Sequence, residues 1–148
     1  MKISLIGIQS NVWKLIVCTF LIEILFIAAI VVPFLGSLGL SMKQILITEV
    51  CFSTTIFLLE IPSGYFADLF GRKVSMVLGA LFWLLGIFFY AFGGTFIMIC
   101  IGAVLWGIGT SFQSGATEAL LYETLHALKR AGEYKKALGN MFFYGRIA

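Results

Sequence analysis

The feature that most limits how this chain can fold is a long run without charge. No Asp, Glu, Lys or Arg occurs between Lys73 and Glu118. As one helix, these 44 residues (74–117) would be about 66 Å long, roughly twice the thickness of a bilayer core. The run must therefore fold back on itself, and Gly93-Gly94-Thr95 is the turn-forming sequence inside it. We expect two membrane helices, at 74–92 and 96–117.

The rest of the chain continues this pattern. Of its 148 residues, 61% are hydrophobic and 11% are charged, whereas soluble domains carry about 25% charged residues. Two further apolar stretches, 15–35 and 44–67, are each long enough to cross a bilayer. A charged amphipathic segment follows at 118–136, and 137–148 becomes apolar again. The sequence predicts an all-α polytopic membrane protein with four complete transmembrane helices and the start of a fifth.

Several classes of function find no support in the sequence. The three cysteines, Cys18, Cys51 and Cys100, each lie in an apolar stretch and are too scattered for a zinc site. No nucleotide-binding loop, metal cluster or nucleophile–base pair is present. The cations lie in short segments between apolar runs, a pattern that does not indicate nucleic-acid binding. We therefore expect neither an enzyme, nor a bound metal or cofactor, nor a nucleic-acid partner.

The placement of cations predicts the orientation in the membrane. Eight Lys and Arg residues fall on one side of the expected helices and only Lys43 on the other, a strong positive-inside asymmetry. The N-terminus and the segment Asp68–Lys73 should be cytoplasmic. The eight are Lys2, Lys14, Arg72, Lys73, Lys129, Arg130, Lys135 and Lys136.

The stretch "IPSGYFADLFGRK" forms the expected cytoplasmic turn between the second and third helices. Gly64 lies one helical turn before Asp68 and, lacking a side chain, would let another helix approach closely. Asp68 is placed to accept hydrogen bonds from the N-terminus of a neighbouring helix. Gly71 permits the positive φ of a sharp reversal. With Arg72 and Lys73, these residues suit a latch that opens and closes.

This turn also carries a family resemblance. "GYFADLFGRK" resembles the G-x-x-x-D-x-x-G-R-K signature that the major facilitator superfamily carries between its second and third helices. The stretch from Ser114 to Tyr122 resembles the end of helix 4 in bacterial drug-efflux-like members. Many proton-driven members have an arginine in helix 4, whereas 96–117 contains none.

The resemblance implies a twelve-helix secondary transporter that moves a small molecule across a bacterial inner membrane by alternating access, in some members with protons. On the resemblance, the gating residues are Gly64, Asp68, Gly71, Arg72 and Lys73. The chain would be the N-terminal part of such a protein, and the C-terminal helices would be its missing partner. We expect the 148-residue chain by itself not to transport.

Acids inside apolar stretches are candidates for function. Glu23 lies about 13 Å from the cytoplasmic end of the first helix, where it could carry a proton, contact a cationic substrate or be a hydrogen-bonded structural acid. Glu49 and Glu60, eleven residues apart, share one helix face. Glu49 is shallow enough to be interfacial. Glu60 could support the latch or line a cavity.

Two more features concern contacts between helices. Gly79, Gly86 and Gly93 recur every seven residues and predict close packing against another helix. Glu123, at the end of helix 4, is the expected charge partner of Arg72 or Lys73, because both segments emerge on the same side.

Two other readings of the function remain open. A small four-helix multidrug exporter that acts as a dimer would be complete at this length, but a dual-topology dimer requires a weak charge bias. A non-transporting four-helix membrane adaptor would require neither the glycine-spaced latch nor the acids at Glu23 and Glu60.

Overall fold

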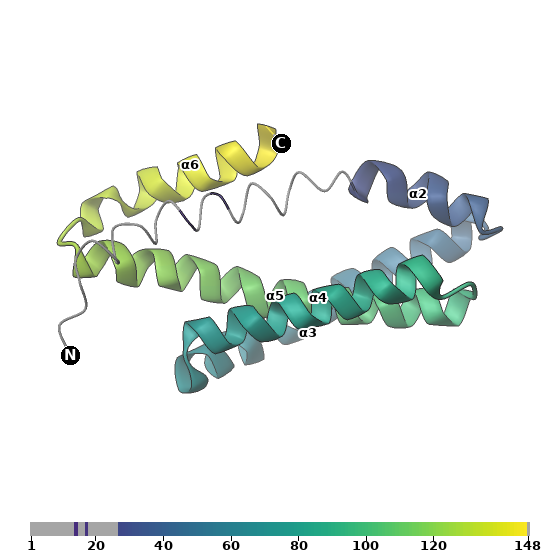
Figure 1. Cartoon of the computed structure of the whole chain (residues 1–148), viewed down its shortest axis with the longest axis horizontal. Helices are drawn as coiled ribbons and strands as arrows, with labels where there is room; N and C mark the ends of the chain where they lie inside the picture. Colours follow the sequence, from purple (N-terminus) through teal and green to yellow (C-terminus); the bar gives the residue numbers. More distant parts are fainter. Residues whose placement is uncertain (1–13, 15–16, 18–26, 148) are drawn as a thin grey trace. The chain divides into compact units, whose positions relative to one another are not determined.

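The computed structural model describes Lys14, Val17 and residues 27–147. All regular elements in these residues are helical, as the sequence predicts (Figure 1). Residues 27–116 form one compact unit, and residues 117–147 belong to a second. The helices are α2 (Ile27–Ser37), α3 (Met42–Phe70), α4 (Arg72–Phe92), α5 (Phe96–Ala127), the short 3-10 helix η1 (Ala131–Glu133) and α6 (Tyr134–Ile147).

Three of the described helices, α3, α4 and α5, are long and apolar enough to cross a membrane. They correspond to the expected spans 44–67, 74–92 and 96–117, and Gly93 and Gly94 separate α4 from α5 as predicted. The remaining expected span, 15–35, is represented in the described residues chiefly by α2. Most of that span, including Glu23, lies outside the described residues.

Glycines and one capping serine set the helix ends of the first unit. Gly39, Gly71 and Gly94 have φ values of 84°, 94° and 58°, which side chains other than glycine adopt at a cost. Ser41 begins α3 with a capping box: its hydroxyl accepts a hydrogen bond from the Gln44 amide at 3.4 Å, and its own amide donates to Gln44 Oε1 at 2.9 Å. These local signals place each turn where the hydrophobic pattern requires it.

An apolar cluster closes the end of this unit that contains the α4–α5 turn. It brings together side chains from α2, α3, α4 and α5 that are almost fully removed from the surface. The ring of Tyr90 belongs to this cluster and meets that of Trp106 edge to face, with centroids 5.5 Å apart. The buried members are Leu35, Ile45, Tyr90, Ile99 and Ala103.

Glycines on both helices hold α4 against α5. A methyl group added at Gly86 would lie 2.9 Å from the amide nitrogen of Trp106 and 3.0 Å from the carbonyl oxygen of Gly102. One added at Gly109 would lie 2.7 Å from the carbonyl oxygen of Gly79. The close packing expected at Gly79 and Gly86 is therefore confirmed. The sequence analysis missed Gly102 and Gly109, which have the same seven-residue spacing on α5.

Hydrogen bonds and aromatic rings complete this packing. Trp83 Nε1 donates to Thr110 Oγ1 across the α4–α5 interface at 3.0 Å, and the rings of Trp83 and Trp106 meet edge to face with centroids 5.7 Å apart. Ser75 Oγ donates to the carbonyl oxygen of Phe112 at 2.9 Å. The hydroxyl of Thr110 thus serves the packing of α4 on α5.

In the second unit, α5 continues to Ala127, ten residues past the expected end at 117. The segment 118–136, expected to be a separate element, therefore begins as a continuation of the helix. No Gly or Pro lies between Ala116 and Ala131 to stop it. The chain then turns through Lys129, whose φ is 58°, and η1 leads into α6. The rings of Tyr122 and Tyr134 meet edge to face, with centroids 5.4 Å apart.

Candidate functional site: the α3–α4 turn and the acids of α3

The turn between α3 and α4 consists of one residue. α3 ends at Phe70, α4 begins at Arg72, and Gly71 between them has φ 94° and ψ 146°. Its amide still donates to the carbonyl oxygen of Ala67 at 3.0 Å, and its carbonyl accepts from the amide of Ser75 at 3.2 Å. Gly71 therefore ends one helix and begins the next, and the positive φ expected for it is observed.

An ion pair spans this turn. The carboxylate of Asp68, in the last turn of α3, pairs with the guanidinium of Arg72, in the first turn of α4. Arg72 is mostly covered, with 19% of its side chain exposed, whereas 61% of the Asp68 side chain is exposed. Asp68 thus contacts the first turn of α4 through the side chain of Arg72. Most of its own side chain stays exposed. Lys73 is exposed beside the pair.

Gly64 is the residue expected to let another helix approach closely. α5 does come near it: the Cα of Gly64 lies 4.0 Å from the position of a methyl group added at Gly115. A methyl group added at Gly64 itself, however, would meet nothing within 4 Å. The missing side chain of Gly64 points away from the described neighbours, so within this unit the approach of α5 does not require a glycine there.

Phenylalanines and a serine pack beneath the turn, and the sequence analysis did not identify them. The ring of Phe66 lies 4.5 Å from that of Phe70 and 5.2 Å from that of Phe112, measured between centroids. Ser63, which is buried, places its hydroxyl 2.9 Å from the carbonyl oxygen of Ser111. Only the three-dimensional packing shows the contacts with Phe112 and Ser111, because these residues are 46 and 48 positions away from Phe66 and Ser63 along the chain.

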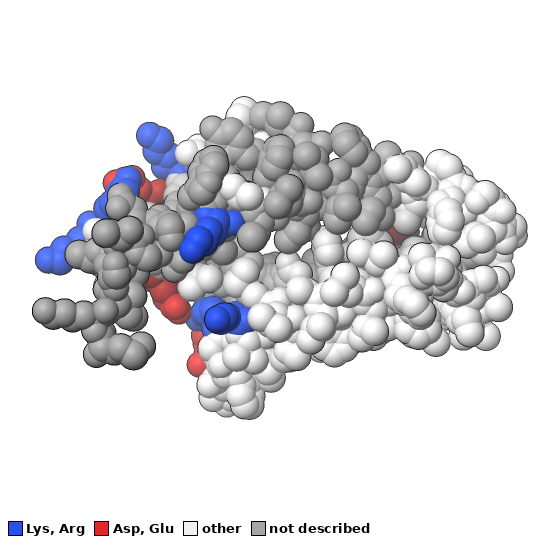
Figure 2. All heavy atoms as spheres, viewed as in Figure 1, with Lys and Arg blue, Asp and Glu red and all other residues white. Residues whose placement is uncertain are grey.

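The second part of the site is the face of α3 that carries Glu49, Ser53 and Glu60. All three side chains are exposed. Glu60 lies ten residues before Phe70, about 15 Å along the helix from its C-terminal end. A carboxylate at that depth is costly in lipid, so this face suits contact with water or protein. Elsewhere, the visible face of the molecule carries few charged side chains over its apolar helices (Figure 2).

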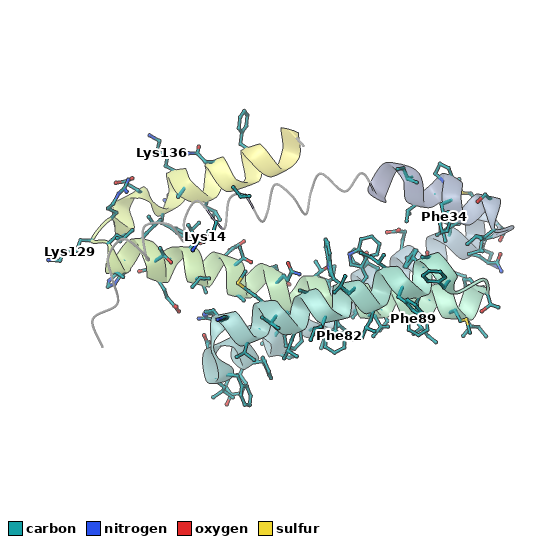
Figure 3. The ribbon with its side chains drawn as sticks, viewed as in Figure 1. Lys14, Phe34, Phe82, Phe89, Lys129 and Lys136 are labelled. Atoms are coloured by element: carbon teal, nitrogen blue, oxygen red, sulfur yellow. The ribbon has the colours of Figure 1, made fainter. Side chains whose placement is uncertain are left out.

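The unit of residues 117–147 carries its own charged surface. Arg130 and Glu133 form two hydrogen bonds, Nε to Oε1 at 2.7 Å and Nη2 to Oε2 at 2.6 Å. These hydrogen bonds raise the pKa of Arg130 and lower the pKa of Glu133 from their ordinary values. Lys129 and Lys136 extend away from the ribbon on either side of η1 (Figure 3). Glu123, the expected partner of Arg72 or Lys73, is exposed near the end of α5.

The described residues offer no metal centre. Within this part of the chain, no three or more His, Cys, Asp and Glu side chains gather where they could hold a metal ion. The chemistry of the site is therefore that of exposed carboxylates, one ion pair and a glycine-dependent turn.

Comparison with known proteins identifies relatives of this chain. The model of the Major Facilitator Superfamily matches residues 12–134. Multidrug resistance protein 1 of Bacillus subtilis (strain 168) is 31% identical over 136 residues, which are 86% of this chain and 34% of that protein. Sugar transport protein 10 of Arabidopsis thaliana is 34% identical over 76 residues, 49% of this chain and 15% of that protein. No solved structure matches significantly.

The family match, over residues 12–134, covers the helices from α2 to η1 and the turn between α3 and α4. The chain spans about a third of the Bacillus relative and less of the plant relative. With its apolar helices, it is a multi-pass membrane protein. The resemblance first carried by Gly64, Asp68, Gly71, Arg72 and Lys73 is confirmed over most of the sequence: the chain belongs to the major facilitator superfamily.

Proposed function

We propose that this chain is the N-terminal part of a secondary transporter that moves a small molecule across a bacterial inner membrane by alternating access. The observation that carries the proposal is the turn at Gly71, where the Asp68–Arg72 pair joins two membrane helices. An exposed carboxylate on a sharp, glycine-dependent turn can exchange partners as neighbouring helices move. The multidrug relative from Bacillus subtilis supports drug efflux as the direction and substrate class.

In this proposal the acids of the first two membrane spans handle substrate or protons. Glu60 lies exposed on α3 and is available to a cavity or to the latch. Glu23, whose placement falls outside the described residues, is the other candidate. Both acids would work only with the rest of the transporter, because substrate sites in secondary transporters form between repeats near the middle of the membrane. The missing helices would supply the other side of the cavity.

The experiment that tests the function compares the 148-residue chain with the full product of its gene. Each is purified and reconstituted in liposomes with an imposed proton gradient, and the movement of cationic dyes is followed. We expect gradient-dependent transport by the full product and none by the 148-residue chain. Absence of transport by the full product, across dyes and small metabolites, would count against the proposal. Uptake by the short chain that Glu23→Gln abolishes would support the small dimeric exporter instead.

We further propose that the N-terminus is cytoplasmic, with the turns at 36–43 and 93–95 on the outside. The eight-to-one asymmetry of cations supports this orientation. In a background without native cysteines, Ser37→Cys should react with a membrane-impermeant thiol reagent in intact cells, and Phe70→Cys should react only after the cells are opened. The opposite pattern of labelling would reverse the topology.

We propose that Glu123 forms a charge pair with Arg72 or Lys73 in one state of the transporter. Arg72→Glu should reduce transport by the full product at least several-fold, because it places a second acid beside Asp68. Adding Glu123→Arg should restore part of the activity. A double variant no better than the worse single variant would remove the support for direct pairing.

A control for this exchange lies in the same chain. Arg130 and Glu133 also form an ion pair, but about half of each side chain is exposed, and both lie outside the membrane spans. Exposed pairs contribute little to stability. Arg130→Glu, Glu133→Arg and their combination should therefore leave transport close to that of the parent, which separates a specific effect at Arg72 from a general effect of charge.

A further inference from the structure

Cations gather on the segment that joins α5 to α6, and the proposed transport function uses none of them. Residues 129–136 contain four cations and one acid, Glu133. Arg130 already binds both carboxylate oxygens of this acid. The other three cations are exposed and form no ion pair with any residue that the structure describes; they are Lys129, Lys135 and Lys136. The segment therefore carries positive charge that is open to a partner.

Backbone hydrogen bonds fix the turn at the end of α5. The amide of Lys129 donates to the carbonyl oxygen of His126 at 3.0 Å, and the amide of Arg130 donates to that of Leu125 at 2.8 Å. This pair of bonds closes a helix around a residue with positive φ, here Lys129 at 58°. The ion pair of Arg130 with Glu133 then spans η1. Local contacts thus set the direction in which the chain leaves α5.

That turn brings the start of α6 back to the place where α5 leaves its uncharged run. The ring of Tyr134, the first residue of α6, meets the ring of Tyr122 edge to face, with centroids 5.4 Å apart. Tyr122 lies one turn, about 6 Å, past Glu118, the first charge after that run. Tyrosine rings favour the boundary between a bilayer and water. Lys135 and Lys136 follow Tyr134 directly, so the anions nearest to them are lipid phosphates.

We propose that Lys135 and Lys136 form a binding site for anionic phospholipids, whose headgroup phosphate accepts hydrogen bonds from the two ammonium groups. Lys129, on the other side of η1, adds to the attraction. A lysine near an anionic bilayer surface contributes roughly a fivefold gain in binding. Cations that only set the topology of a chain require no fixed geometry, whereas hydrogen bonds and a ring contact position these lysines. The site requires neither transport nor one particular orientation in the membrane.

Native mass spectrometry tests the site by counting the lipids that the chain retains. The 148-residue chain, purified in a nonionic detergent, is mixed with equal amounts of phosphatidylglycerol and phosphatidylcholine that have identical acyl chains. We expect the parent to retain phosphatidylglycerol preferentially, and Lys135→Gln with Lys136→Gln to bind it at least about tenfold more weakly. Arginine at both positions keeps the charge and should preserve binding. Equal retention of the two lipids by the parent, or unchanged binding by the glutamine variant, would overturn the proposal.

Two controls separate this site from a general effect of charge. Lys2→Gln with Lys43→Gln removes the same charge outside the segment, and its binding of phosphatidylglycerol should stay within about twofold of the parent. A loss equal to that of the Lys135 and Lys136 variant would refute the site. Tyr134→Ala keeps every charge but removes the ring contact and should weaken binding several-fold, whereas Tyr134→Phe should not. Equal binding by these two Tyr134 variants would show that the turn does not position the lysines, and would also refute the site.

Discussion

Gly86→Ala is expected to destabilise the packing of α4 on α5 by roughly 1–3 kcal/mol, the usual cost of overfilling a packed interface. The added methyl group would meet three backbone atoms: the amide nitrogen and Cα of Trp106, at 2.9 and 3.1 Å, and the carbonyl oxygen of Gly102, at 3.0 Å. Backbone atoms cannot rotate away as a side chain can, so the two helices must separate. Alanine favours a helix over glycine by about 1 kcal/mol, and the steric cost is expected to exceed this gain.

Gly64→Ala is the matched control, because it makes the same chemical change in a membrane helix where the methyl group meets nothing within 4 Å. The thermal midpoints of the purified chains in one detergent would be compared by circular dichroism. The midpoint of Gly86→Ala should fall by several degrees, while that of Gly64→Ala should stay at or slightly above the parent value. Equal midpoints for the two variants would show that the glycines do not set the distance between α4 and α5.

Gly71→Ala should be destabilising for a different reason, the conformation of the backbone. Space is not at issue, since an added methyl group would have no neighbour within 4 Å. The φ of 94° and ψ of 146° lie near a region that glycine alone occupies readily, and holding another residue there costs about 1–3 kcal/mol. Alanine would drive the turn toward a different geometry and would shift Asp68 relative to Arg72. Loss of stability and loss of the ion pair should therefore occur together.

Unfolding of Gly71→Ala would be compared with that of Gly36→Ala, a glycine in helical conformation in α2 that also has open space around it. The Gly36 variant should be neutral or slightly more stable, because alanine favours the helix. Trypsin cleavage after Arg72 and Lys73 gives a second, local measurement, and we expect it to be faster in Gly71→Ala as the turn loosens. A Gly71→Ala chain as stable and as slowly cleaved as the parent would show that the turn tolerates a side chain.

Much of the architecture follows from hydrophobic length and glycine placement. The uncharged run that begins after Lys73 is too long for one span, and Gly93 and Gly94 mark the reversal, so α4 and the start of α5 were predictable. The far end of α5 was not, because charges such as Glu118 mark where a helix leaves lipid and not where it ends. Only Lys129, with its positive φ, and the following 3-10 turn interrupt the helix.

Some features of the candidate site were likewise predictable from the sequence, and others were not. The position of Gly71 and its backbone conformation were readable from the spacing of the motif, whereas the direction of the missing side chain of Gly64 was not. That direction depends on the rotation of α3 against α5, which a single sequence does not specify. The same holds for Phe66 beneath the turn and for Gly102 and Gly109 opposite α4. The contacts of each of these residues can be predicted only when the register between the two packed helices is known.

The edge-to-face contact of Trp83 and Trp106 also gives this protein an internal optical reporter. The two indoles belong to opposite sides of the α4–α5 hairpin, and the Tyr90 ring lies 5.5 Å from that of Trp106. At such separations, excited aromatic rings exchange energy and quench one another. Any motion that draws the hairpin apart should therefore change the emission of the unlabelled chain. Opening of these two helices could be followed in real time without an added dye.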